Sequence, residues 1–161
     1  MSTTGSADEA FADLYRDRWA AMVRLAHLLT GDNAAAQDLV QDAFVKVSAQ
    51  IRDRGRPLDE PSAYLRRAVV NSCNSWHRRQ GIERRHNRPE PEPLHLGPEL
   101  DETWAALDGL PAKRRTALVL RFYEDLSYDD IAESMGVRPA TVRSLIHRGL
   151  ASLRKELTHD R

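Results

Sequence analysis

Apolar residues recur at three- and four-residue intervals through most of the chain, which is the spacing of an amphipathic helix. The first such stretch runs from Asp8 to Leu29, after residues 1–7, which are small and polar and which we expect to be disordered. The segment TGD then ends this helix, and Asp32 or Asn33 can cap a second one. Because no stretch alternates convincingly with a period of two, the pattern predicts an all-α protein.

The second predicted helix, AAAQDLVQDAFVKVSAQI, has two different faces. The apolar stripe consists of Ala36, Val40, Ala43, Phe44, Val47 and Ile51. The other face carries Asp38, Gln41, Asp42 and Val45. Taken alone, an acidic face of this kind is most simply a surface in contact with water.

A third helix is predicted to begin at Pro61, because proline is tolerated in the first turn of a helix. It follows an arginine-rich loop at Arg52–Glu60, and its single cysteine, Cys73, has the properties of a small buried residue. The residues left to face outward are Arg66, Arg67, Asn71, Asn74, Ser75, Arg78 and Arg79. Such a mixture suits contact with single-stranded nucleic acid, but it fits a solvated basic helix equally well.

Residues 81–98, GIERRHNRPEPEPLHLGP, have neither helical nor strand periodicity and contain four of the eight prolines. A composition rich in proline and charge is typical of an extended linker. We therefore predict two small helical domains, residues 8–80 and residues 99–158, joined by a flexible linker.

Helical spacing resumes after this linker, with Leu100, Trp104 and Leu107 predicted to face inward. Pro111 is expected to open the next helix, PAKRRTALVLRFYED. The residues expected to pack against the last third of the chain are Leu118, Phe122 and Leu126.

The stretch Leu126–Leu157 has the pattern of two short helices and a tight turn. Ser127 is a good N-cap, and Asp130 completes an S-x-x-D capping box. Gly136 supplies a position where φ can be positive, and Pro139 lies where the second helix would have its first turn. The inward residues of the second helix are Val142, Ile146, Leu150 and Leu153. This arrangement is a predicted helix-turn-helix.

The outer face of the second helix is basic and carries short polar side chains. Its candidate contact residues are Arg138, Thr141, Arg143, Ser144, His147 and Arg148. No acidic residue occurs from Arg138 to Lys155. Arginines suit phosphates and guanine edges, and Ser and Thr let a helix approach DNA closely. The face therefore favours DNA binding over a helical domain with the same spacing that touches no DNA.

The overall charge is zero, from 24 Lys and Arg against 24 Asp and Glu, so the chain is no generic polycation. The charges are uneven, however, because residues 66–88 hold seven arginines and one glutamate. A neutral total therefore hides local basic surfaces that suit phosphate.

The composition also limits the chemistry. With a single cysteine the chain forms no intrachain disulfide, and no Cys/His cluster or catalytic constellation stands out. We predict no cofactor, no metal site and no enzymatic activity. No apolar run approaches the roughly 18–20 residues that span a bilayer, and the N-terminus lacks the features of a signal peptide. We therefore expect a cytoplasmic protein without membrane contact.

Four segments together resemble a known family. They are DLVQDAFVKV, SAYLRRAVVNSCNSWHRR, DGLPAKRRTALVLRFYEDLSYDDIAESMGV and TVRSLIHRGLASLRKEL, in this order. The chain from about Phe11 to Leu157 is similar to the extracytoplasmic-function (ECF) sigma factors of bacterial RNA polymerase, in particular to the SigE-like actinobacterial group. One helix-turn-helix would be a weak signal, whereas the full set of segments around the linker is specific.

The resemblance implies two helical domains, called sigma-2 and sigma-4, and three contact surfaces. Core RNA polymerase is expected to contact Asp38, Gln41 and Asp42. The minus-ten promoter element, opened to a single strand, is expected to contact Arg52, Arg54, Arg56, Asn71, Asn74, Arg78 and Arg79. The outer face of the second helix-turn-helix helix is expected to enter the major groove at the minus-35 element. The implied partners are core polymerase and promoter DNA, with an anti-sigma factor as a further candidate.

Three positions depart from the pattern of this family. Arg138 stands where Ser is frequent, Leu145 where Arg is common and Ser75 where Asp is common. These differences bear on which promoter sequence is read. We also expect no fused regulatory domain after Leu157.

Other functions fit the residues less well. A stand-alone helix-turn-helix regulator that dimerises on duplex DNA needs no acidic Asp38 face, and the sequence has no heptad seam for a dimer. An interaction protein such as an anti-sigma factor or a scaffold needs no acid-free helix face. An enzyme using Cys73 or a histidine lacks the surrounding constellation.

Overall fold

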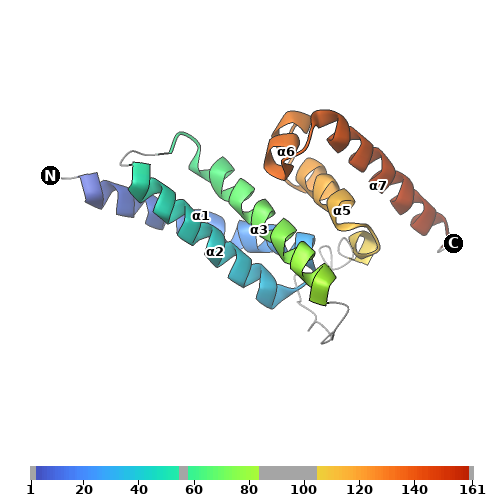
Figure 1. The fold of residues 1–161 in the computed structure, drawn as a ribbon, viewed down its shortest axis with the longest axis horizontal. Coiled ribbons are helices and arrows are strands. Elements are labelled where there is room, and N and C mark those ends of the chain that lie inside the picture. Colours follow the sequence, from blue (N-terminus) through green and yellow to red (C-terminus); the bar gives the residue numbers. More distant parts are fainter. Residues whose placement is uncertain (1–2, 55–57, 84–104, 160–161) are drawn as a thin grey trace.

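The structure is a computed structural model, and it describes residues 3–54, 58–83 and 105–159. In chain order its helices are α1 (Thr3–Thr30), α2 (Asn33–Arg54), α3 (Pro61–Glu83), α5 (Ala112–Leu118), the π-helical turn η1 (Val119–Tyr123), α6 (Tyr128–Met135) and α7 (Pro139–His159) (Figure 1). Residues 105–108 are also helical. Across the described ranges there is no strand, so the predicted all-α fold is confirmed.

Helices α1, α2 and α3 form the first domain, a three-helix bundle. Its centre contains fully buried side chains from all three helices, among them Met22, Phe44 and Leu65. The sharp turn between α1 and α2 uses Gly31, whose φ is 73°, and Asp32, whose Oδ1 accepts a hydrogen bond from the Ala35 N–H at 3.0 Å. Asp32 is therefore the cap that the sequence predicted for this helix.

Helix α1 is longer than predicted at its N-terminal end. It begins at Thr3, so residues 3–7 are helical and the prediction of disorder there is wrong. Extending an existing helix needs one fixed residue for each new hydrogen bond, whereas starting one needs several. The packed part of α1 supplies that start. Residues 3–7 contain no proline, so nothing stops the helix from extending toward its N-terminal end.

The second domain consists of α5, η1, α6 and α7. Leu118, Leu120, Ile131 and Val142 are buried in its core. At Gly149, α5 and α7 approach each other closely, because a Cβ there would lie 2.8 Å from Cδ1 of Leu118. Glycine therefore allows the two helices to pack closely.

The helix predicted after Pro111 does not continue as an α-helix. After Leu118 it widens into η1, where the Glu124 N–H bonds to the Val119 carbonyl at 3.1 Å. Leu118 and Leu126 are buried as predicted, but Phe122 is 64% exposed, so its predicted packing is wrong. A single π turn shifts the register of the side chains that follow it, and periodicity alone does not reveal this shift.

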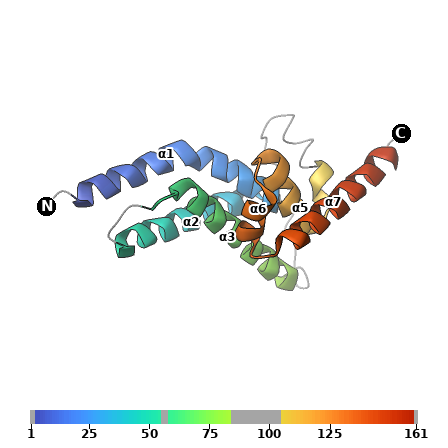
Figure 2. The ribbon, with the colours of Figure 1, turned by 90° about the horizontal axis from the view of Figure 1, so that it is seen from above.

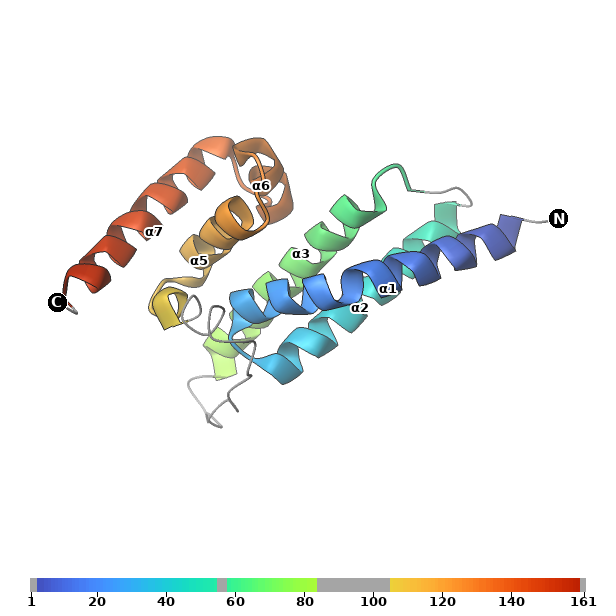
Figure 3. The same cartoon turned by 180° about the vertical axis from the view of Figure 1, so that it is seen from behind.

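The two domains pack against each other along α3 and α6, with α1 touching α5 and η1. Figures 1 and 3 show α3 between the other two helices of its bundle and the second domain, whereas α7 lies on the outer side. Viewed from above, the molecule is elongated, with the N- and C-termini at opposite ends (Figure 2). The sequence had left open whether the domains pack together.

Among the described residues, three arginines make polar contacts between the domains. Arg67 forms an ion pair with Glu133, and Nη1 of Arg66 lies 3.9 Å from Oε2 of Glu124. Arg115 is buried in the second domain, and its Nη1 donates to the carbonyl of Leu29 at the end of α1, at 3.2 Å. The linker predicted at residues 81–98 begins within α3, and residues 84–98 lie outside the described part of the chain, as do Leu100 and Trp104.

Candidate nucleic-acid interface

The helix-turn-helix has the local geometry that its sequence predicted. The Ser127 Oγ accepts a hydrogen bond from the Asp130 N–H at 3.1 Å. Gly136 has φ 68° and ψ 35°, the left-handed conformation that ends α6. The Val137 N–H bonds back to the Ala132 carbonyl at 3.0 Å, as in a Schellman cap. Pro139 is the first residue of α7, so the turn fixes the direction in which α7 leaves α6.

Helix α7 separates its apolar and polar residues by face. Val142 and Ile146 are buried, and Leu150 and Leu153, which were predicted to be inward, are half-buried. All six candidate contact residues are exposed, namely Arg138, Thr141, Arg143, Ser144, His147 and Arg148. Neither α3 nor the rest of the first domain covers this face, so it is available to a large ligand such as duplex DNA.

A tyrosine that the sequence reasoning missed lies beside this face. The ring of Tyr128, the first residue of α6, has the guanidinium carbons of two arginines near it. The Cζ of Arg121 is 5.1 Å from the ring centroid and that of Arg143 is 5.5 Å from it. Both distances are within the range of a cation–π contact. Three residues from separate elements come together here, which no local spacing could indicate.

Helix α3 has a partly exposed polar face. Asn71, Arg78 and Arg79 are exposed, and Asn74 is half-buried. Nη2 of Arg78 donates to Ser75 Oγ at 3.0 Å, so the position that departs from the family pattern orients a candidate phosphate contact. These residues follow one another at three- and four-residue intervals and therefore share one side of α3.

The other two outward predictions on α3, Arg66 and Arg67, are corrected by the structure. Only 18% of the Arg66 side chain and 34% of the Arg67 side chain are exposed. Both guanidinium groups turn toward the second domain, where Glu124 and Glu133 supply opposite charge. The sequence showed a basic face on α3 and an acidic α6, but not that they meet.

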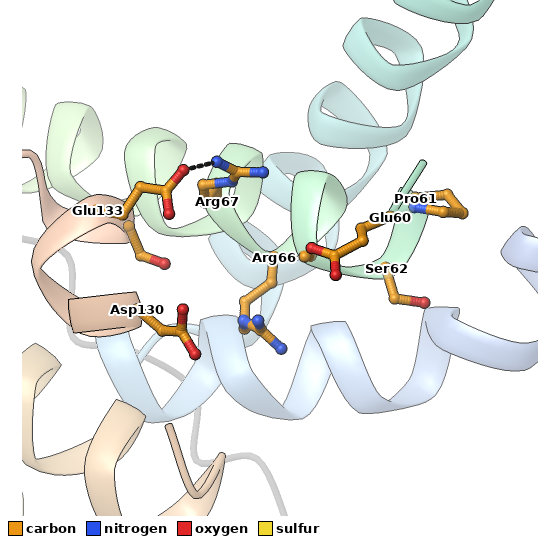
Figure 4. Close-up of a pocket in the computed structure, with 9 residues that line it drawn as sticks. Glu60, Pro61, Ser62, Arg66, Arg67, Asp130 and Glu133 are labelled. Atoms are coloured by element: carbon orange, nitrogen blue, oxygen red, sulfur yellow. Dashed lines mark hydrogen bonds and ion pairs between the residues drawn. The ribbon is translucent and has the colours of Figure 1, made fainter. Parts of the chain in front are cut away.

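A cleft of about 530 Å³ lies at this meeting point (Figure 4). Glu60 and Ser62 line it at the start of α3, and Asp130 and Ser134 line it from α6. The Arg67–Glu133 ion pair closes one side of it (Figure 4). Two arginines, Arg66 and Arg67, line the cleft from α3, and the carboxylates of Glu60, Asp130 and Glu133 line it from both sides. The cleft is therefore a polar seam between the domains whose charges largely offset one another.

A second cleft, of about 630 Å³, lies between the end of α2 and the start of α3. Arg54 and Asn71, both predicted as contacts of an opened DNA strand, line it together. Lys46 and Tyr64 line it too, and the sequence reasoning had assigned no role to Lys46. Asp59 and Glu60 also line the cleft, so its cations lie beside two carboxylates. The aromatic ring and the amide have the chemistry to hold a nucleobase, and the cations have the charge to contact its phosphate. The loop predicted at Arg52–Glu60 is corrected by the structure, because α2 continues through Arg52 to Arg54. Arg52 is exposed at the end of α2, and Arg56 lies outside the described residues.

The acidic face of α2 is fully available. Asp38, Gln41 and Asp42 are exposed, and one turn further on Val45 is 62% exposed. None of the first three makes a contact that the fold requires, since the opposite stripe of α2 provides its packing. An apolar residue beside two carboxylates and an amide is an arrangement suited to a protein partner.

The buried cysteine of the first domain is not reactive. Cys73 has no exposed surface, and burial raises the pKa of its thiol from 9.0 to about 12. The reactive thiolate is therefore disfavoured, as predicted for a packing residue. Within the described ranges no group of three or more His, Cys, Asp or Glu side chains is placed to hold a metal ion. In the same ranges no helix is long and apolar enough to cross a membrane.

Comparison with known families agrees with this arrangement of two domains. Residues 9–82 match the family described as Sigma-70 region 2, and residues 100–153 match Sigma-70, region 4. The first match covers α2 and most of α1 and α3, and the second covers α5, η1, α6 and most of α7.

Individual relatives cover nearly the whole chain. The RNA polymerase sigma-E factor of Streptomyces coelicolor is 35% identical over 155 residues, which cover 91% of this chain and 85% of the relative. The ECF RNA polymerase sigma factor SigE of Mycolicibacterium smegmatis is 34% identical over 94% of this chain, which spans 63% of that relative's length. Among solved structures, the sigma factor RpoE bound to the anti-sigma factor NepR from Bartonella quintana aligns with a TM-score of 0.74, at 26% identity, over 95% of this chain and 99% of that one. The chain therefore belongs to the extracytoplasmic-function sigma factors and is similar to the SigE proteins of actinobacteria.

Proposed function

We propose that this chain is a promoter-specificity subunit that binds core RNA polymerase, directs it to specific promoters and assists their opening. The observation that carries the proposal is the outer face of α7, where six candidate contacts are exposed and no acidic residue intervenes. In a chain of this family, such a face suits the major groove of the minus-35 element. Arg143 and Arg148 supply base or phosphate contacts, and Ser144 and His147 lie between them on the same helix.

The partner at the acidic face of α2 is core RNA polymerase. Asp38, Gln41 and Asp42 form an exposed patch that complements a basic helical surface. Electrostatic complementarity of this kind orients two proteins as they meet and suppresses incorrect partners. Val45 adds an apolar contact at one end of the patch.

The cleft lined by Arg54 and Asn71 holds the opened minus-ten element. Taking a base out of the duplex costs a few kcal/mol of stacking and pairing, which contacts in a pocket can offset. Arg54 and Lys46 provide cations for the backbone of the strand, while Tyr64 offers a ring for stacking. Arg78 and Arg79 extend the basic side of α3 toward its C-terminal end.

An anti-sigma factor is the third proposed partner. The similar RpoE aligns over both domains at once while bound to the anti-sigma factor NepR. A protein of that kind would stabilise the arrangement in which α3 packs against α6. These partners imply a cytoplasmic location, which remains a prediction.

The test is co-elution of the purified chain with core RNA polymerase on a sizing column at moderate salt. We expect a stable complex, and we expect Asp38→Arg with Asp42→Arg to weaken it by at least tenfold, because repulsion replaces attraction at both positions. The matched control is Asp13→Arg with Asp17→Arg, two exposed acids on α1 outside the patch. A chain that binds duplex DNA specifically but not core polymerase would be a stand-alone regulator instead.

A further inference from the structure

We propose that Tyr128 is a positioning residue for Arg143, holding its guanidinium ready for DNA through the face of the tyrosine ring. The inference rests on the proposed function, in which the outer face of α7 contacts duplex DNA. Tyr128 is half-buried at the start of α6, and Arg143 is exposed on α7. The ring therefore joins the first helix of the helix-turn-helix to a reading side chain of the second.

The contact with Arg143 is one of two on the same ring. Arg121 lies 5.1 Å from the ring centroid by its Cζ, and its Nη1 also donates to the Leu126 carbonyl at 2.8 Å. Arg121 is thereby fixed to the backbone just before α6. The Tyr128 ring thus contacts two arginines, Arg121, which is also bonded to the backbone, and Arg143, which is exposed on α7.

A fixed arginine has a physical advantage in recognition. An unrestrained arginine populates many rotamers, and binding has to reduce them to one, which weakens affinity. An attraction between the guanidinium and the ring limits these rotamers before DNA arrives. The second cation, Arg121, adds positive potential close to α7, which favours phosphate.

The alternative is that Tyr128 only packs against the core, since it also touches the buried residues of the second domain. Loss of packing would weaken DNA binding by lowering stability, whether or not Arg143 is present. If Tyr128 instead positions Arg143, replacing Tyr128 must have no effect on DNA affinity once Arg143 has also been replaced. A double-mutant cycle separates the two.

The probe is a duplex selected by the full wild-type chain from a randomised pool, and affinity is measured for the full chain. We expect Tyr128→Leu to weaken binding about two- to fivefold, the range that corresponds to an exposed cation–π contact. We expect Tyr128→Phe, which keeps the ring, to change affinity by less than about twofold. In the Arg143→Ala background, Tyr128→Leu should have no further effect.

Tyr123→Leu is the matched control, because Tyr123 is an exposed tyrosine of the same domain. We expect it to leave affinity unchanged. An equal loss from Tyr128→Leu with and without Arg143 would overturn the inference, as would wild-type affinity in Tyr128→Leu while Arg143→Ala binds weakly. If the wild-type chain selects no duplex, the inference fails together with the proposed function. A lower melting temperature in Tyr128→Leu does not disturb the test. Such a loss of stability would affect DNA binding equally in the wild-type background and in the Arg143→Ala background.

Discussion

The two helices proposed to contact promoter DNA present their arginines in opposite ways. On α7, Arg143 and Arg148 are exposed and face no acidic residue of their own helix before Glu156. On α3, Arg66 and Arg67 are turned against the second domain and paired with Glu124 and Glu133. A basic residue on a helix is therefore available to DNA only if the fold does not already use its charge.

If the proposed function holds, the difference decides which promoter contacts are possible while the two domains are packed together. The face of α7 can meet duplex DNA with the two domains packed together, as they are in this structure. On α3, Asn71, Arg78 and Arg79 are exposed in the same arrangement, whereas access to Arg66 and Arg67 requires the domains to separate. The Arg67–Glu133 ion pair at this seam is exposed enough to be weak, and a partner that binds either face can shift the balance.

The largest expected effect is on α7. Arg143→Ala with Arg148→Ala should weaken binding to a selected duplex by between about 30-fold and 10⁴-fold, since each good arginine–base contact contributes about 1–3 kcal/mol. The salt dependence should also become shallower if either arginine contacts phosphate. Binding is measured by fluorescence anisotropy at several salt concentrations.

The control for this prediction is the corresponding change on α3. Arg78→Ala with Arg79→Ala removes two exposed arginines from the proposed minus-ten surface. Duplex affinity of the free chain should stay unchanged, while promoter opening by its complex with core polymerase should fall. Equal losses of duplex affinity in both variants would mean that α7 has no special part in reading DNA.

The next prediction compares the change in stability when a glycine in each domain is replaced by alanine. Gly149→Ala should destabilise the second domain by about 1–2 kcal/mol, because its new Cβ would press on Leu118, and this outweighs the better helix propensity of alanine. Gly81→Ala, at an exposed site of α3 with nothing within 4 Å, should stabilise by up to about 1 kcal/mol. Urea unfolding measures the stability of both variants. Equal changes in stability would mean that α5 and α7 are packed less closely at Gly149 than the structure shows.

Much of the fold was predictable because it follows from local patterns. The turn at Gly136 and the caps at Asp32 and Ser127 are written into neighbouring residues, and the buried stripe of α2 follows the helical period. Phe122 was not predictable, because a π turn changes the register without any glycine or proline to mark it.

The candidate site was predictable to the same extent. The exposed face of α7 follows from periodicity. The pairing of Arg67 with Glu133 joins positions 66 residues apart, and the approach of Arg143 to Tyr128 depends on the angle between two helices. Contacts of this kind are set by tertiary packing, which residue spacing does not encode. The roles of the individual residues in binding stay predictions.

A smaller effect tests the buried side of α3, where Cys73 packs in the core. Burial raises the pKa of the Cys73 thiol from 9.0 to about 12, so above pH 9 the unfolded chain releases a proton that the folded chain retains. The contribution of this thiol to the free energy of unfolding is therefore fully present below about pH 9. It is lost as the pH rises, by about 1.4 kcal/mol at pH 10. The measurement is urea unfolding at pH 8 and pH 10 for the wild type and for Cys73→Ala. The wild type should lose more stability over this interval, and identical losses would mean that the thiol titrates normally.

The smallest expected effect is at the seam itself. Arg67→Glu should repel Glu133 and shift the domains toward separation, by no more than about fivefold, since exposed ion pairs contribute up to about 1 kcal/mol. Adding Glu133→Arg restores opposite charges and should restore the wild-type distribution. Fluorescence transfer between labels at Ala20→Cys and Ala151→Cys, two exposed positions on α1 and α7, reports the separation, and the buried Cys73 should escape labelling. Arg115 and Leu29 are unchanged in every variant, so a full separation by Arg67→Glu alone would show that the ion pair, and not the buried arginine, holds the domains together.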